Sequence, residues 1–455
     1  RTFQIIHHYT NFLQKLPLFR ESLQQSAAED YLNNEKRLQC HVYDEDILLS
    51  LRSILSVWLE NFLISDLPRH GPGSTADAGN SLLAKEKSLW WDEMLSHLLP
   101  NFFPVGTEVT SPFYRVSETI FVPKTAMSLR TISMEPATLQ FWQQPIFLAF
   151  DRIFKRRLSD HISLDDQERS RSLTILASGT GGYATIDLSM ASDSISLYLV
   201  ERVFPKEVLL PLVATRSTHT CLNGAIIPLH KFSPMGSSVN FPIESILFAA
   251  MCELVAKEHH YTAEQRGNAY VVYGDDIILT SELVPGLLVV LEKCGFLVNT
   301  EKSFSTGLFR ESCGVFAYNG KDITTPSIPR DFRGRPAPIT DNWLSCMVDL
   351  SNRLLVSGLW RARKDILDIL PTSQMYFTTF QSEFLQSTRV NYKHLRSYSQ
   401  SGIWSFRAQN NQLARRATPS IRRIPKCTYS AAIPQILLLP GPTSTWQVFT
   451  GSPDY

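Results

Sequence analysis

The sequence predicts an α+β fold in which antiparallel strands pack against buried helices. One observation is a pair of apolar runs, Tyr270–Tyr273 and Ile277–Leu279, that flank the turn-forming residues Gly274–Asp276. Gly beside Asp favours a tight turn, and β-branched and aromatic flanks favour strands, so we expect a hairpin. A second observation is the helix-like run 241–254, which is too apolar for a surface helix. We expect this helix to lie buried against the sheet that contains the hairpin.

The turn of this hairpin carries two adjacent carboxylates, Asp275 and Asp276. For an isolated Gly-Asp-Asp the simpler interpretation is a surface hairpin with solvated side chains. Both flanking strands are fully apolar, however, so the hairpin is expected to be buried, and buried carboxylates need a partner. Hard oxygen ligands suit Mg²⁺, so the sequence predicts a divalent cation at this turn.

A second acidic stretch, residues 183–196, reads as a short strand, a turn and a helix. Asp187 is placed at the end of the predicted strand, and either Ser192 or Asp193 is expected to cap the helix. A strand-end Asp beside a hairpin Asp-Asp can hold two metal ions roughly 4 Å apart for nucleotidyl transfer. On its own, Asp187 is equally compatible with an ordinary residue at the start of a helix.

Basic residues occur in two further segments. Residues 121–132 form a predicted strand-like arm with Lys124 and Arg130, either a solvated charged hairpin or a cationic clamp on a triphosphate. Lys302 lies near the end of a predicted strand, 296–304. It is either a proton donor or a plain strand-end lysine. Residues 309–318 are predicted to form another strand.

A small-residue loop that contains Gly236 precedes the apolar helix. Asn240 and Glu244 lie one turn apart at its start, hence on one face. The simpler interpretation is capping by Asn240 and a helix-dipole interaction by Glu244. The alternative is that Asn240 or Glu244 packs beside Asp193 and fixes its carboxylate.

Composition limits the classes of protein. The 455 residues are too many for one small core, and a net charge of +1 leaves nucleic-acid contacts to local basic patches. The cysteines are odd in number, seven, and include no C-x-x-C pair, which argues against a disulfide framework or zinc site and for a reducing cytosol. No apolar run is long enough to span a bilayer and we find no signal peptide, so no membrane partner is expected.

The order of these segments resembles the motif series of viral RNA-directed RNA polymerases. The amino-acid sequences of the segments are most similar to those of the levivirus-like replicase catalytic subunits of single-stranded RNA bacteriophages. The resembling segments span about residues 69–320 and are 122–125, 187–196, 235–236 with 244–245, 273–279 and 309–314. The stretches at 187–196 and 309–314 are specific, whereas Gly-Asp-Asp alone is not, and narnavirus-like and mitovirus-like polymerases share parts of the pattern.

The resemblance implies a right-hand polymerase with fingers, a thumb and a palm whose antiparallel sheet packs on helices. The implied division is an N-terminal helical region and fingers at 1–120, fingers with a basic NTP arm at 121–182, a palm with inserted finger segments at 183–308, the palm end and thumb at 309–412, and a basic Pro-rich tail at 413–455.

The resemblance also implies template-directed RNA synthesis from NTPs with two Mg²⁺ ions, for which Mn²⁺ can substitute. The implied catalytic residues are Asp187, Asp275, Asp276 and Lys302, of which the three aspartates bind metal. The implied NTP-binding residues are Lys124, Arg130, Asp193, Gly236, Asn240 and Glu244. Asn240 departs from the pattern, because a Thr is expected there in the phage family.

The implied partners are a single-stranded RNA template, host translation elongation factors Tu and Ts and a ribosomal protein, in the cytoplasm of an infected bacterium. A reverse transcriptase is the alternative enzyme, although Asp193 is small and polar where a bulky residue would exclude the 2′-hydroxyl. A non-catalytic RNA-binding protein that keeps the fold is the remaining alternative. The intact carboxylates and Lys124 argue against it, because a binder needs none of them.

Overall fold

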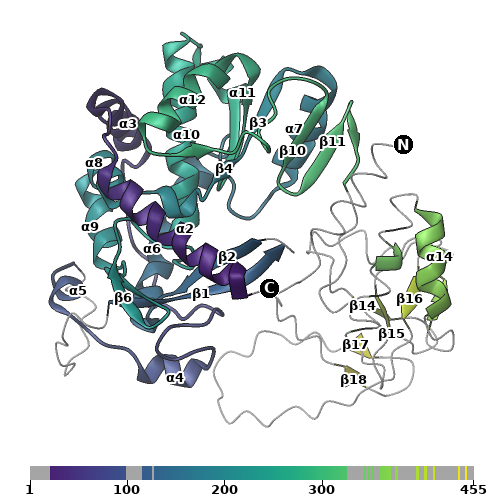
Figure 1. Ribbon diagram of the computed structural model, residues 1–455, viewed down its shortest axis with the longest axis horizontal. Coiled ribbons are helices and arrows are strands. Elements are labelled where there is room, and N and C mark those ends of the chain that lie inside the picture. The colour runs from purple at the N-terminus through teal and green to yellow at the C-terminus, as the bar shows by residue number, and fades with distance from the viewer. Residues whose placement is uncertain are drawn as a thin grey trace. The chain divides into compact units, whose positions relative to one another are not determined.

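The computed structural model describes residues 21–98, 115–125 and 128–324, together with residues 343, 347, 350–352, 354 and 359–369 and short strands beyond residue 374. The chain divides into two compact units, Leu13–Thr324 and Arg1–Phe12 with Thr325–Tyr455. The first unit contains every residue of the predicted site (Figure 1).

The centre of the first unit is a three-stranded antiparallel sheet, here called the palm sheet. Its order is β3 (Tyr183–Ile186), β8 (Asp276–Thr280) and β7 (Tyr270–Tyr273). Ile277 of β8 pairs with Ile186 on one side and with Val272 on the other. The predicted hairpin is therefore confirmed, and β3 extends it into a sheet.

Helix α10 (Asn240–Glu258) packs against β7 and is buried along nearly its whole length. Its neighbours include α3 (Glu45–Trp58) and α12 (Val284–Lys293). Because every side of α10 meets other elements of the core, its sequence is apolar all round instead of amphipathic. The prediction of a buried helix against the sheet is confirmed.

The remaining helices of this unit lie partly around that core and partly below it in the view of Figure 1. They are α2 (Glu21–Cys40), α4 (Leu82–Lys87), α5 (Glu93–Leu98), α6 (Ala137–Arg157), α7 (Glu168–Thr180), α8 (Leu197–Val203), α9 (Lys206–Ala214) and α11 (Ala263–Ala269), with short 3-10 turns η3 (Ser192–Ser194) and η4 (Ser281–Leu283). Ser196 caps α8 by accepting a hydrogen bond of 2.9 Å from Leu199 N–H. The prediction that Ser192 or Asp193 caps this helix is wrong, because both lie in the preceding 3-10 turn.

A second sheet has the order β2-β1-β5-β6. Its strands are β1 (Val116–Thr125), β2 (Ser128–Met134), β5 (His219–Leu222) and β6 (Ala225–Pro228). The antiparallel hairpin β1–β2 is the predicted basic arm, and Val122 of β1 pairs with Arg130 of β2.

Two predicted strands differ in the structure. Within 296–304 only β9 (Leu297–Val298) is a strand, paired with β4 (Leu188–Ser189), and Lys302 lies in the turn that follows. The polar run after Val298 folds into that turn, where Lys302 N–H donates to Asn299 O at 3.1 Å.

The predicted strand 309–318 is instead a hairpin of β10 (Phe309–Ser312) and β11 (Val315–Tyr318), which β12 (Lys321–Asp322) extends. Cys313 and Gly314 turn the chain with φ of +47° and +71°. This small sheet packs against α7.

In the second unit, the described elements are α14 (Trp360–Ile369) and three paired sets of short strands. The strands are β13 (Met375–Phe377) with β16 (Leu413–Arg415), β14 (Arg396–Tyr398) with β15 (Trp404–Phe406), and β17 (Leu439–Pro440) with β18 (Trp446–Gln447). Within the described residues of the whole chain, no helix combines the length and apolarity that a membrane span requires.

Candidate active site

Three aspartates meet at one end of the palm sheet. Ile186 at the end of β3 pairs with Ile277 in β8, so the next residue, Asp187, comes opposite Asp276 in the antiparallel register. Asp275 occupies the turn directly before Asp276. Asp275 is exposed, whereas Asp187 and Asp276 are half-buried. The two acidic segments that lie far apart in the sequence therefore form one carboxylate cluster.

Helix α10 fixes the turn that carries this cluster. Gly274 N–H donates to Ser245 Oγ at 3.0 Å, and the ring of Phe241 packs edge-on against Tyr273 at 4.9 Å between centroids. Gly274 has a φ of +60°, and a Cβ there would lie 2.4 Å from the Phe241 ring. Both the backbone conformation and the close approach therefore require glycine at this position.

The turn after β9 orients Asp187. Asn299 Nδ2 donates to Asp187 Oδ2 at 2.8 Å, and Asn299 N–H donates to the carbonyl of Asp187 at 2.9 Å. Asp187 N–H in turn donates to Ser303 Oγ at 3.1 Å. Sequence analysis missed Asn299, because the strand predicted at this point gave no reason to single out one polar residue.

The hairpin β10–β11 orients Asp276. Asp276 Oδ1 accepts hydrogen bonds of 3.0 Å from both Ser312 Oγ and Cys313 N–H. Arg310, in the same hairpin, is fully buried and donates to backbone carbonyls, including that of Tyr183 in β3 at 2.7 Å. The segment 309–314 thus connects β3 to Asp276. The family resemblance marked this segment as specific but gave it no role.

The cluster carries negative charge that its neighbours leave poorly compensated. Partial burial raises the pKa of Asp187, and the nearby Asp275 raises it further, against the opposing effect of Lys302. Partial burial also raises the pKa of Asp276, and Asp275 and Asp187 add to the increase. Within the described part of the chain, no Lys or Arg forms an ion pair within 4.0 Å of any of the three aspartates.

Hard carboxylate oxygens with elevated pKa values match the chemistry of a divalent-cation site. In the side-chain positions described, however, no group of three or more His, Cys, Asp or Glu residues already has the spacing to hold a metal ion. Metal binding by Asp187, Asp275 and Asp276 therefore stays a prediction.

Three basic side chains from two segments act electrostatically on this cluster or on one another. Loss of hydration lowers the pKa of Lys124, and the positive charges of Arg130 and Lys302 lower it further. Asp187 and Asp275 act on the same amine in the opposite direction. The β1–β2 arm and the turn after β9 therefore bring their cations together beside the aspartates, although Lys124, Arg130 and Lys302 are all exposed.

Glu244 is buried within reach of the same charges. Ser192 Oγ contacts both of its oxygens, at 3.1 and 3.3 Å. Burial raises the pKa of Glu244 well above its usual value, and Asp275 and Asp193 raise it further. Burial and the neighbouring carboxylates therefore both favour the protonated form of Glu244. Ser192 was assigned only a capping role by sequence, but it connects the acidic segment 183–196 to α10.

Two other predicted NTP-binding residues have clear structural contacts. Gly236 has a φ of +133°, and a Cβ there would lie 2.0 Å from the carbonyl oxygen of Ser133 in β2. Asn240 Oδ1 accepts a hydrogen bond of 2.9 Å from Ser233 Oγ. These contacts explain why the small-residue loop packs closely on β2, and contact with a nucleotide stays a prediction for both residues.

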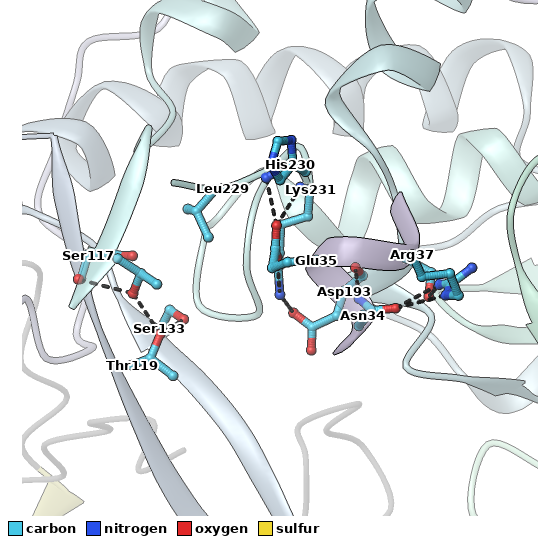
Figure 2. A network of polar contacts seen from close by, with 12 residues as sticks. Asn34, Glu35, Arg37, Ser117, Thr119, Ser133, Asp193, Leu229, His230 and Lys231 are labelled. Atoms are coloured by element: carbon cyan, nitrogen blue, oxygen red, sulfur yellow. Dashed lines mark hydrogen bonds and ion pairs between the residues drawn. The ribbon is translucent and has the colours of Figure 1, made fainter. Parts of the chain in front are cut away.

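Asp193 is fixed by a buried lysine and not by Asn240. Lys231 Nζ donates to Asp193 Oδ1 at 2.7 Å and lies 3.1 Å from Glu35 Oε1 (Figure 2). Asn34 Nδ2 donates to the backbone carbonyl of Asp193 at 2.7 Å. The expectation that Asn240 holds this carboxylate is wrong, because Asn240 bonds to Ser233 instead.

This arrangement of a carboxylate-bearing palm sheet, a buried helix and a basic hairpin arm is the fold of a viral RNA-dependent RNA polymerase. The structure is similar to the RNA-dependent RNA polymerase of a human picorbirnavirus, with a TM-score of 0.53 over 81% of this chain and 77% of that chain. The two sequences are 13% identical, so the similarity establishes the fold.

The chain belongs to a particular family of these proteins, the RNA replicase beta-chain family, whose sequence model matches residues 105–341. It is 38% identical over 224 residues to the RNA-directed RNA polymerase subunit beta of Escherichia virus Qbeta, covering 49% of this chain and 36% of that protein. It is 39% identical over 205 residues to the RNA-directed RNA polymerase beta chain of Escherichia phage MS2, covering 44% and 36%.

These alignments confirm the resemblance to single-stranded RNA phage replicases. The chain spans little more than a third of the length of the curated relatives that it matches.

Proposed function

We propose that this protein synthesises RNA from ribonucleoside triphosphates on an RNA template and replicates the genome of a single-stranded RNA phage. The observation that carries the proposal is the convergence of Asp187, at the end of β3, with Asp275 and Asp276 in the β7–β8 turn. Membership of the RNA replicase beta-chain family supports the same activity.

In this proposal Asp187 and Asp275 hold two Mg²⁺ ions and Asp276 assists. Such ions, when bound, lower the pKa of the attacking 3′-hydroxyl and neutralise the triphosphate. Asn299 engages one oxygen of Asp187, and Ser312 engages one oxygen of Asp276. These hydrogen bonds restrict rotation of both carboxylates, so little conformational entropy remains to be lost when a cation binds.

The neighbouring cations are assigned to the phosphates. Lys124 and Arg130 would hold the β and γ phosphates, where a guanidinium offers paired donors and an ammonium a point charge. Lys302 would donate a proton to the departing pyrophosphate. Asp193, together with Asn240 or Glu244, would accept a hydrogen bond from the 2′-hydroxyl, which distinguishes ribonucleotides from deoxyribonucleotides.

The proposed partners are a single-stranded RNA template held mainly through its phosphates, host elongation factors Tu and Ts and a ribosomal protein. The host partners are inferred from the resemblance to phage replicases, and the template follows from the proposed activity. The alternative activity is reverse transcription. Asp193 argues against it, because this side chain is small and polar and a bulky residue would be needed to exclude the 2′-hydroxyl.

Nucleotide choice by the purified complete protein tests the proposal. Incorporation of labelled rNTP and dNTP on one RNA template is measured with Mg²⁺, with and without a bacterial extract. The proposal predicts incorporation of rNTP in preference to dNTP, and a requirement for the extract would indicate host subunits. Preferential incorporation of dNTP would identify a reverse transcriptase, and no incorporation of either nucleotide in any condition would contradict a polymerase.

A further inference from the structure

We propose that Lys231, clamped by helix α2, is a positioning residue that fixes Asp193 for recognition of the NTP ribose. The inference rests on the proposed function, because it assumes that Asp193 reads the sugar. It adds an N-terminal helix and a lysine, neither of them among the predicted site residues, to the elements that determine nucleotide selectivity.

Lys231 lies in an environment that forces it to pair with carboxylates. Its side chain is 0% exposed, its ammonium lies 2.7 Å from Asp193 Oδ1 and 3.1 Å from Glu35 Oε1, and it sits 3.6 Å from the ring centroid of Tyr31. A buried charge without partners is strongly destabilising, so this ammonium and the Asp193 carboxylate hold each other in place.

Helix α2 fixes both partners of this ion pair. Asn34 donates to the carbonyl of Asp193, and Glu35 Oε2 accepts the backbone N–H of His230 at 2.6 Å (Figure 2). Arg37 Nη2 donates to Ser194 Oγ at 2.8 Å. One turn of α2 therefore binds the 3-10 turn that carries Asp193 and the segment that carries Lys231.

Asp193 keeps part of its side chain outside the ion pair. That side chain is 13% exposed, whereas the side chain of Lys231 is fully buried. Besides burial, Asp275, Asp193 and Asp276 all raise the pKa of Glu244. The buried lysine thus engages one oxygen of Asp193, and Glu244 interacts electrostatically with both Asp193 and the carboxylate cluster.

The ion pair also determines the hydrogen-bonding character of Asp193. Burial alone would lower the pKa of Lys231, but Asp193, Tyr31 and Glu35 outweigh it and raise the pKa, so the amine stays protonated. The Asp193 carboxylate accepts a hydrogen bond from this cation, and a carboxylate paired with a cation acts as an acceptor. A 2′-hydroxyl can satisfy it, and a deoxyribose leaves it without that partner.

The test compares kcat/KM for one rNTP and its dNTP in the complete protein, with the extract if synthesis requires it. The variants are Lys231→Met, Asp193→Ala, the double variant and Lys231→Arg. Lys85→Met is the matched control, because Lys85 is also buried but, among the described residues, donates to the backbone carbonyls of Gly71 and Gly73 and to no carboxylate. Thermal unfolding of every variant measures the structural cost.

Lys231→Met is expected to narrow the rNTP/dNTP ratio by about tenfold, as Asp193→Ala does. The double variant should lower the rNTP/dNTP ratio no further than either single variant. Lys231→Arg should restore part of the ratio, and Lys85→Met should keep the wild-type ratio. If Lys231→Met does not fold, Asn34→Ala decides, because it removes the bond from α2 to Asp193, and it is expected to narrow the ratio by about threefold.

An unchanged rNTP/dNTP ratio in Lys231→Met would overturn the inference, and so would an unchanged ratio in Asn34→Ala if that variant has to decide. The proposed function stays intact in either case, provided that the wild type makes RNA. An equal fall in both rates would show that Lys231 serves folding alone and would overturn it as well. A wild type that makes no RNA would overturn the proposed function and this inference with it.

Discussion

Asn299 donates a 2.8 Å hydrogen bond to the carboxylate of Asp187 across 112 positions of the sequence. The bond connects the turn after β9 to the end of β3, and a second bond, from Asn299 N–H to the carbonyl of Asp187, reinforces it. Asn299 thus occupies one oxygen of the Asp187 carboxylate and fixes the orientation of that carboxylate. At metal sites, residues that hydrogen-bond to the metal ligands have this role.

Asn299→Ala is therefore expected to lower kcat about tenfold and to raise the Mg²⁺ concentration needed for half-maximal activity. A Mg²⁺ titration of NTP incorporation measures both quantities. Asn268→Ala is the control, since Asn268 is exposed and contributes only its backbone carbonyl, to Tyr183 Oη. An unchanged Mg²⁺ dependence in Asn299→Ala would show that the bond has no part in metal binding.

Substitution of Gly274 should damage the turn that carries Asp275. Gly274→Ala places a Cβ at a φ of +60° and 2.4 Å from the Phe241 ring. We expect a loss of about 1–3 kcal/mol in the free energy of unfolding and loss of most of the activity. Gly267→Ala, in α11 with no atom within 4 Å of the new Cβ, is the control and should be neutral or stabilising. Wild-type activity in Gly274→Ala would contradict a fixed turn.

Lys124→Ala is expected to raise KM for NTP about tenfold while changing the affinity for RNA much less. The reason is its position beside Arg130, Lys302 and the aspartates. Lys206→Ala, an exposed lysine at the start of α9, controls for the loss of one positive charge. If Lys124→Ala instead leaves KM unchanged and makes RNA binding weaker and less salt-sensitive, Lys124 contacts the template.

Glu135 should make stability depend on pH. Its side chain is fully buried, and burial raises its pKa from 4.5 to about 7. In this range the folded state binds the proton and the unfolded state has released it, so the free energy of unfolding falls as pH rises from 4.5 to 7. Glu135→Gln should remove up to about 3 kcal/mol of that decrease.

Denaturant unfolding across this pH range measures the effect of Glu135. The exposed Glu292 provides the control variant, Glu292→Gln, in which the free energy of unfolding should change with pH as it does in the wild type. An identical slope in Glu135→Gln and the wild type would place the titrating group elsewhere.

The sequence predicted the elements whose signals are local. The β7–β8 hairpin combines apolar strands with a Gly-Asp turn, and α10 is apolar on all sides, so neither depends on distant residues for its type. The strand-end position of Asp187 and the family resemblance predicted that it lies beside the hairpin aspartates. The register of β3 and β8 brings it opposite Asp276.

The supporting contacts could not be predicted, because each joins residues far apart in the chain. Asn299, Ser312 and Lys231 are single polar residues whose partners are set by tertiary packing. The strand predicted at 296–304 failed where the polar run after Val298 satisfies its backbone within a turn. The strand predicted at 309–318 failed at Cys313-Gly314, where positive φ reverses the chain. In both places a local turn interrupts the run of strand-forming residues.

The most direct test of the central claim is single-turnover incorporation of a labelled NTP by Asp275→Asn at saturating Mg²⁺. Asp160→Asn is the matched control, because Asp160 is exposed and, in the part of the chain that the structure describes, forms a single long ion pair, of 3.7 Å with Arg169. The two-metal account predicts that Asp275→Asn loses more than about a hundredfold in rate while RNA binding and thermal unfolding stay close to wild type, and that Asp160→Asn keeps its rate. A rate for Asp275→Asn within about tenfold of wild type would contradict a catalytic metal site at the palm-sheet turn.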